Sequence, residues 1–158
     1  MIKKIKIGKY IFSIDKSGNS ASYYCSKKVN ICVNQNLIKK LISIYKRYKK
    51  TFRICLHNNN KQKIHCMIVV MGKKDKTKIH KHVTKTEYYY IHHGKMNLFV
   101  KDGQKNKYQK NLINCKTSIF CKINNQTYHQ VVPKSDIVVF SEIRDGPFKQ
   151  NDSIILKE

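Results

Sequence analysis

The chain lacks a long apolar segment, and this absence excludes a membrane-spanning helix. Its longest unbroken apolar run, residues 66–71, has six residues, whereas a spanning helix needs about 20. The first twelve residues carry several lysines but no apolar stretch of the length found in a secretory signal. We therefore expect a cytoplasmic protein without membrane insertion.

Acidic residues are also scarce. Only 9 Asp and Glu residues oppose 33 Lys and Arg residues, which gives a net charge of +24. Thirty of the basic residues are Lys and three are Arg, while Lys, Asn and Ile together supply 65 of the 158 residues. This bias is typical of an AT-rich coding sequence. Because nucleic-acid binders favour clustered basic residues and the bidentate contacts of Arg, we predict no nucleic-acid partner and only a weak attraction to anions such as sugar phosphates.

No two cysteines have C-x-x-C spacing, and this absence argues against a zinc ribbon. The six cysteines lie at residues 25, 32, 55, 66, 115 and 121. Because no secretory signal is predicted, we expect free thiols in a reducing compartment. The length of 158 residues and the hydrophobic fraction of 41% suffice for one folded domain.

The sequence does contain one helical segment followed by many short β segments. Leu37, Leu41, Ile44, Tyr45 and Tyr48 recur at helical spacing, which predicts an amphipathic helix over residues 36–49. Alternating apolar and polar residues before it predict short N-terminal strands. Runs rich in Ile, Val, Phe and Tyr predict further strands at residues 51–57, 64–71, 86–94, 95–103, 118–123, 127–133 and 136–143. Many short strands with regular turns indicate an all-β sandwich or barrel.

A set of histidines and one glutamate lies within these strands. His80 and His82 are two residues apart, so on a strand their imidazoles point to the same face. Glu87 opens the next predicted strand and reaches the same point if the two strands pair. His129, in a late strand, offers a third imidazole. Three imidazoles and one carboxylate are a suitable ligand set for one divalent transition metal (Fe, Mn, Zn, Ni or Co), with positions left open for water or substrate.

The spacing of these residues resembles the cupin superfamily. The first cupin motif runs Gly, H-x-H, three or four residues, Glu, six residues, Gly. His80, His82, Glu87 and Gly94 follow this order in register, while the leading Gly falls two residues early, at Gly72. The second motif has Pro, one residue, Gly, two residues, then His. Here the ligand His129 is kept, but Asn124 and Gln126 replace the Pro and Gly of the turn.

A closer resemblance covers residues 25–150. The segments RICLH, IHCMIVVM, HKH, KTEYYYIHHG, TYHQVVP and VVFSEIRDGPF are similar to the WbuC-type cupin metalloproteins of bacterial surface-polysaccharide gene clusters. The resemblance implies a cupin jelly-roll β-barrel with a metal in its mouth, preceded by an N-terminal α-helix. We expect residues 1–50 to form the N-terminal strands and helix, and residues 51–158 to form the barrel, in one structural domain.

Further polar residues are predicted to surround the metal. Arg53, Cys55 and His57 alternate onto one strand face, and if this face is interior, the buried Arg53 suits a carboxylate or phosphate. A structural hydrogen bond is an equally good interpretation of Arg53. His57 and Tyr89 are candidates for acid–base catalysis. His65 is a second-rank pocket candidate.

The resemblance adds two candidates for substrate binding, Lys85 and Arg144. An ordinary solvated side chain is the alternative for Lys85, and an ion pair with Asp145 is the alternative for Arg144. Tyr88 and Tyr90 are expected to face outward, toward a second layer or a homodimer interface.

The sequence therefore predicts a metal-binding cupin that acts on a small saccharide or nucleotide sugar in surface-polysaccharide biosynthesis. Isomerase or epimerase chemistry is the leading hypothesis, with the metal polarising a carbonyl or enediolate oxygen. One alternative is an Fe(II)-dependent oxygenase, since the same ligand set holds Fe(II). The other is a non-catalytic module that binds a sugar or metal and regulates a partner.

Overall fold

The computed structural model describes residues 3–15, 21–25, 30–101 and 107–156, which form two β-sheets, one α-helix and one short 3-10 helix. The predicted all-β architecture with an N-terminal helix is confirmed. The elements in chain order are β1 (Lys4–Ile7), β2 (Tyr10–Asp15), β3 (Ala21–Cys25), α1 (Gln35–Tyr48), β4 (Phe52–Cys55), β5 (Ile64–Gly72), β6 (His80–His82), β7 (Glu87–His93), β8 (Lys95–Lys101), β9 (Tyr108–Asn114), β10 (Phe120–Ile123), β11 (His129–Pro133), β12 (Ile137–Asp145), η1 (Gln150–Asp152) and β13 (Ser153–Ile155).

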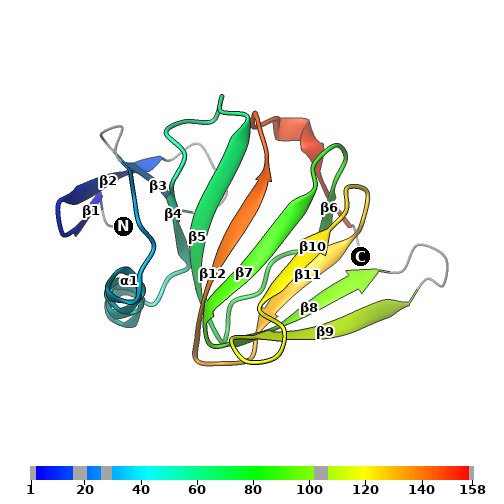
Figure 1. Cartoon of the computed structure of the whole chain (residues 1–158). Coiled ribbons are helices and arrows are strands. Elements are labelled where there is room, and N and C mark those ends of the chain that lie inside the picture. The colour runs from blue at the N-terminus through cyan, green and yellow to red at the C-terminus, as the bar shows by residue number, and fades with distance from the viewer. Residues whose placement is uncertain (1–2, 16–20, 26–29, 102–106, 157–158) are drawn as a thin grey trace.

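The two sheets differ in size and composition. The larger sheet has the order β1-β2-β3-β4-β5-β12-β7-β10, and the smaller has the order β13-β6-β11-β8-β9. Every pairing is antiparallel except that of β3 with β4. Figure 1 shows the N-terminal strands extending the larger sheet at one end, while the smaller sheet covers its β7 and β10 end.

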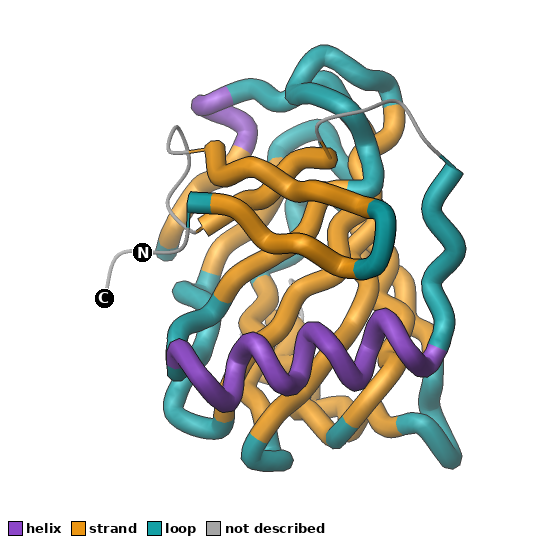
Figure 2. The backbone as a smooth tube through the Cα atoms, turned by 90° about the vertical axis from the view of Figure 1, so that its left-hand side faces the viewer, coloured by secondary structure: helices purple, strands orange, loops and turns teal. Residues whose placement is uncertain are grey.

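The helix forms at the predicted place, one residue earlier at each end. The Asn34 side chain accepts a hydrogen bond from the backbone N–H of Leu37 and caps its N-terminus. Lys49 ends the helix in the left-handed conformation and donates its N–H to the Tyr45 carbonyl. Figure 2 shows α1 lying across the strands of the larger sheet, beside the N-terminal strands.

Two apolar cores lie on opposite faces of the larger sheet. The outer core fills the space between this sheet, α1 and the N-terminal strands, and its members include Phe12, Leu41, Ile54, Ile68 and Val139. The barrel core fills the space between the two sheets, and its members include Val69, Tyr89, Met96, Leu98 and Phe140. Adjacent residues of β5, Ile68 and Val69, belong to different cores because strand side chains alternate between faces.

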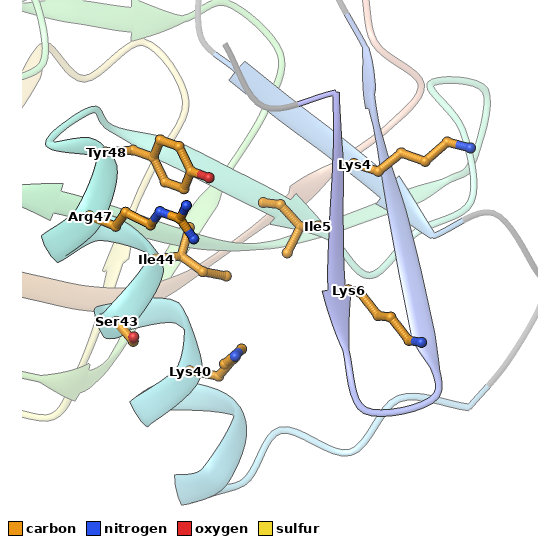
Figure 3. Close-up of a pocket in the computed structure, with 8 residues that line it drawn as sticks. All are labelled: Lys4, Ile5, Lys6, Lys40, Ser43, Ile44, Arg47 and Tyr48. Carbon is orange, nitrogen blue, oxygen red and sulfur yellow. The ribbon is translucent and has the colours of Figure 1, made fainter.

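A cavity of about 200 Å³ lies between β1 and α1 at the edge of the outer core, which contributes Ile5 to its lining. Figure 3 shows Ile5 directed toward the helix, whereas the side chains of Lys4 and Lys6 extend away from it. Arg47 and Tyr48 form part of its helical wall. Among the described residues, no helix has the length and apolar character needed to cross a bilayer.

Candidate metal centre

The four predicted ligands converge from both sheets. His80 and His82 lie on β6 and His129 lies on β11, which pairs with β6 in the smaller sheet. Glu87 begins β7 in the larger sheet. The condition considered for Glu87, that its strand pairs with that of His82, is not met: β6 and β7 belong to different sheets. Glu87 reaches the histidines across the barrel interior because its side chain points inward.

The ligand atoms of this cluster are close together and shielded from water. One nitrogen or oxygen from each of His80, His82, Glu87 and His129 lies within 4.8 Å of the others. Glu87 Oε1 is 3.0 Å from His82 Nε2, and Glu87 Oε2 is 3.0 Å from His129 Nε2. Glu87 and His129 are each 1% exposed, so the centre of the cluster is buried.

The imidazole orientations fit a bound metal. Each Nδ1 faces an oxygen acceptor outside the cluster: the Lys78 carbonyl at 2.8 Å from His80, the Thr127 carbonyl at 2.9 Å from His129, and Asp152 Oδ2 at 3.2 Å from His82. When these Nδ1 atoms carry the proton, each Nε2 presents its lone pair to the centre.

Two of the buried Nε2 atoms also lack a hydrogen-bond partner. Those of His82 and His129 do so although a Glu87 oxygen lies 3.0 Å from each. Buried polar atoms without partners are rare, and these two are aimed at a common point that a cation would occupy.

Glu87 is held in its charged form. Burial opposes ionisation of Glu87, but the approach of His129 and His82 and the positive charge of Arg144 outweigh it, so the pKa of Glu87 lies well below its ordinary value. Burial lowers the pKa of His80, with a further contribution from the neighbouring His129. Burial opposes the charge of His129, but the carboxylate of Glu87 outweighs this and raises the pKa of His129, so a metal that binds there displaces a proton from this imidazole.

The turn before His129 retains its shape without the motif's glycine. Gln126 stands where the cupin motif has Gly, and its φ of 61° is in the left-handed region. Its backbone N–H donates to the His82 carbonyl at 2.6 Å, and its side-chain Nε2 donates to the Val83 carbonyl at 2.9 Å. These two bonds tie the turn to the ligand strand β6.

Tyr89 contacts the cluster directly. Its hydroxyl donates to Glu87 Oε2 at 2.9 Å, and its ring packs on Phe140 in the barrel core. Burial raises the pKa of Tyr89 well above its ordinary value, and the charge of Glu87 raises it further. The hydroxyl therefore stays protonated at neutral pH and is a hydrogen-bond donor to the carboxylate. Its acid–base role remains a prediction.

Beginning at Glu87, a row of polar side chains crosses neighbouring strands of the larger sheet. In the register of the sheet, Glu87 lies opposite Arg144, and Arg144 lies opposite His65. The His65 ring stacks on the His57 ring, with centroids 4.2 Å apart. We call Glu87, Arg144, His65 and His57 the polar row. Arg144 Nη1 is 3.4 Å from Glu87 Oε1 and 3.6 Å from Glu142 Oε1.

Arg144 contacts Glu87 and Glu142, and not Asp145, which was its alternative predicted partner. Asp145 instead accepts a hydrogen bond from the backbone N–H of Thr86. Burial opposes the charge of Arg144, but Glu142 and Glu87 outweigh it and raise the pKa of Arg144. Its guanidinium is therefore a fixed positive charge beside the cluster.

Arg53 and His57 both belong to the interior face of the barrel. Arg53 pairs with Val69, a member of the barrel core, and its Nη1 lies 4.0 Å from Met67 Sδ. Its Nε is buried without a hydrogen-bond partner. His57 Nδ1 lies 3.0 Å from the Cys66 carbonyl, and burial lowers the pKa of His57. The substrate-binding and catalytic roles of these two residues remain predictions.

Lys85 is not the solvated side chain that we considered as its alternative. It is buried, and its Nζ donates to the Pro147 carbonyl at 2.8 Å and lies 5.9 Å from the centre of the Phe148 ring. Burial lowers the pKa of Lys85, and the charge of Arg144 lowers it further. Its predicted contact with substrate stays a prediction.

Sequence reasoning missed two carboxylates of this region. Asp152 contacts His82 from 70 residues further along the chain, and Glu142 contacts Arg144 from the same strand face. Glu142 had a readable signal, since it lies two residues before Arg144 on a strand. Asp152 had none, because only the pairing of β13 with β6 brings it to His82.

Comparison with models of known protein families finds no match, and no curated protein matches the chain in sequence. Solved structures are similar in fold. The capsular polysaccharide assembling protein CapF from Staphylococcus aureus has a TM-score of 0.58 and 14% identity, over 67% of this chain and 30% of that one. An oxalate decarboxylase from Lactobacillus farciminis, in complex with formate, has a TM-score of 0.51 and 19% identity, over 60% of this chain and 27% of that one.

A third similar structure, a protein from Shewanella oneidensis, has a TM-score of 0.58 and 6% identity, over 69% of this chain and 75% of that one. This chain thus spans less than a third of the length of CapF and of the decarboxylase. At these identities the likeness shows the fold alone. The chain has the all-β cupin fold, with a His/Glu cluster between its two sheets.

Proposed function

We propose that the chain is a metal-binding cupin that acts on an anionic saccharide or nucleotide sugar in surface-polysaccharide biosynthesis, by isomerase- or epimerase-type chemistry. The observation that carries the metal site is the buried cluster of His80, His82, Glu87 and His129, in which two Nε2 atoms have no hydrogen-bond partner. The WbuC-type sequence resemblance and the fold shared with a capsular polysaccharide assembling protein support the biological setting.

The proposed metal is one divalent transition ion held by these four side chains. When bound, such an ion polarises an oxygen of the substrate and stabilises negative charge that develops there. Tyr89 keeps Glu87 in position through its 2.9 Å hydrogen bond. In the tautomer whose Nδ1–H donates to the Cys66 carbonyl, the His57 Nε2 lone pair accepts a proton from substrate; in the tautomer whose Nδ1 accepts from the Cys66 N–H, Nε2 carries a proton that it can donate.

The proposed substrate carries negative charge because cations line the interior beside the cluster. Arg53 and Arg144 each have a buried Nε without a hydrogen-bond partner. A carboxylate or phosphate satisfies such donors with charge-assisted hydrogen bonds. Lys85 is a third proposed substrate contact, reached when its bond to the Pro147 carbonyl is released.

Metal titration tests the first part of this proposal. We expect about one Co²⁺, Ni²⁺ or Mn²⁺ ion per chain in protein first stripped with a chelator, measured by elemental analysis and calorimetry. His129→Ala and Glu87→Gln should each weaken binding by more than the roughly 10- to 100-fold typical for loss of an outer-sphere partner. Replacement of the exposed His93 by Ala is the matched control and should change nothing. Absence of uptake by the wild-type chain contradicts the metal site.

The chain offers a matched pair of arginines to test the anionic substrate. Arg53 faces the barrel interior, whereas Arg47 lies on α1 at the cavity beside β1. Arg53→Ala should weaken binding of sugar phosphates and nucleotide sugars at least tenfold and leave metal content unchanged. Arg47→Ala should have no comparable effect. A large loss of thermal stability in Arg53→Ala with unchanged ligand binding would assign Arg53 a structural role instead.

A further inference from the structure

The loop that joins two ligands is fastened along its length to the C-terminal part of the chain. Residues 83–86 connect His82 on β6 with Glu87 on β7, and thus cross from one sheet to the other. The hydrogen bonds that fasten this loop to residues 145–152 are Val83 N to the Asp152 carbonyl, Thr84 N and Oγ1 to Asp152 Oδ1, Lys85 Nζ to the Pro147 carbonyl, and Thr86 N to Asp145 Oδ2.

Asp152 makes the most contacts of this segment. It is 5% exposed, and its two carboxylate oxygens have different partners. Oδ1 accepts from Thr84 N at 3.0 Å and from Thr84 Oγ1 at 2.6 Å, while Oδ2 lies 3.2 Å from His82 Nδ1. In Figure 1 the red C-terminal segment runs beside β6, and β13 pairs with it through Ser153 and His82. Asp152 is therefore held in place independently of His82.

The acceptor of His82 differs in kind from those of the other two histidines. His80 and His129 face neutral backbone carbonyls within two residues of themselves. His82 faces a carboxylate supplied from 70 residues away. A carboxylate acceptor fixes the Nδ1–H tautomer and raises the basicity of the opposite nitrogen more than a carbonyl does, which strengthens the bond from that nitrogen to a metal.

We infer that Asp152 is a positioning residue for the metal centre: it forms a carboxylate–histidine–metal arrangement with His82, and the C-terminal strand β13 is thus part of the site. The inference rests on the metal-binding function proposed above. It also assigns Lys85, Asp145 and Pro147 a role in the absence of substrate, since their contacts fasten the connection between His82 and Glu87.

Co²⁺ titration of the full-length chain and three variants tests this inference. Asp152→Ala removes both sets of contacts, and we expect its Co²⁺ affinity to fall about 10- to 100-fold. Asp152→Asn keeps one acceptor oxygen for His82 but places an amide N–H₂ against the Thr84 donors, so we expect an intermediate loss. Thr84→Val removes the hydroxyl contact of Asp152 but leaves the Asp152–His82 pair, and its affinity should stay within twofold of wild type.

The d–d absorption spectrum of bound Co²⁺ separates positioning from general stability. Asp152→Ala should shift this spectrum, whereas Thr84→Val should reproduce the wild-type spectrum even if it lowers the melting temperature. Wild-type affinity and spectrum in a folded Asp152→Ala chain overturn the inference. If Asp152→Ala does not fold, Asp152→Asn takes its place. Its Co²⁺ affinity and absorption spectrum are then compared with those of Thr84→Val. If the wild-type chain does not bind Co²⁺, the metal site itself is wrong. This outcome is distinct from a failure of the Asp152 inference alone, in which the wild-type chain still binds Co²⁺.

Discussion

The outer core and the barrel interior share the larger sheet but differ in chemistry. On the outer face, β5 and β12 contribute Ile68, Val70 and Val139 to the apolar core that they share with α1. On the inner face, β5 begins with His65 and β12 ends with Glu142 and Arg144, while most of the rest of that face belongs to the barrel core. Both faces thus carry an apolar core, and one end of the inner face also gathers the buried charges.

A third of the acidic residues of the chain are gathered near the histidine cluster. The chain has 9 Asp and Glu residues, and three of them, Glu87, Glu142 and Asp152, are buried around the histidine cluster. A buried charge is tolerated only when it is paired or binds a metal. The cations Arg144 and Lys85 partly balance the site, so its electrostatics do not follow from the overall charge of +24.

The largest expected effect tests whether the two cores are independent. Leu41 is fully buried in the outer core, and Leu41→Ala should lower the free energy of unfolding by about 2–5 kcal/mol. Because α1 lies on the opposite face of the sheet from the ligands, metal affinity should not change. Urea unfolding and calorimetric titration on the same preparation check both parts.

The matched change on the inner face is Phe140→Leu. It should lower the free energy of unfolding by only about 1 kcal/mol. It should nevertheless weaken metal binding, because the Phe140 ring packs on Tyr89, which in turn holds Glu87. If Leu41→Ala weakened metal binding more than Phe140→Leu, the two faces would be coupled and the comparison would fail.

The next effect is a dependence of stability on pH that comes from the inner face. His65 is 2% exposed, and burial, with the charge of neighbouring His57, lowers its pKa to about 4. Between about pH 6.5 and 4 the unfolded chain binds a proton at this position that the folded chain does not. The free energy of unfolding should therefore fall as pH falls through this window, by on the order of 2 to 3 kcal/mol from His65 alone.

Other buried groups near the cluster change the size of this pH effect. Burial lowers the pKa of His57 as well, and the depressed pKa of Glu87 adds a loss of stability at lower pH, so both act in the same direction. The raised pKa of His129 acts oppositely, because its contribution is lost as pH rises. Denaturation of metal-free protein at pH 7 and pH 4.5 measures the net slope. His65→Gln should flatten it, and an unchanged slope would contradict the role of His65.

The smallest effect concerns the turn that carries His129. Gln126→Ala and Gln126→Gly both remove the hydrogen bond to the Val83 carbonyl, but only Gly relieves the left-handed backbone at φ 61°. The Gly variant should be more stable than the Ala variant by about 1 kcal/mol. Thermal unfolding of the two variants side by side is sufficient. An Ala variant as stable as the Gly variant would contradict this account of the turn.

The sequence by itself determined most of the elements and the residues of the candidate metal cluster. Runs rich in Ile, Val, Phe and Tyr between turn signals predicted most strands, and helical spacing predicted α1 to within one residue. H-x-H followed by Glu, with the histidine of a late strand, selected the residues that now lie together. These are local properties, since side-chain direction in a strand or helix is set by the backbone of that element. Strand β9, rich in polar residues, gave too weak an alternation to be predicted.

Only the tertiary structure decided how these elements meet. The sequence offered strand pairing as one condition under which Glu87 reaches His82, and the two strands instead lie in different sheets. The contact of Asp152 with His82 and the row from Glu87 through Arg144 to His65 likewise depend on strand order and register. Pairings between residues far apart in the chain are set by the burial of both sheets' apolar faces at once, and no local pattern encodes that choice.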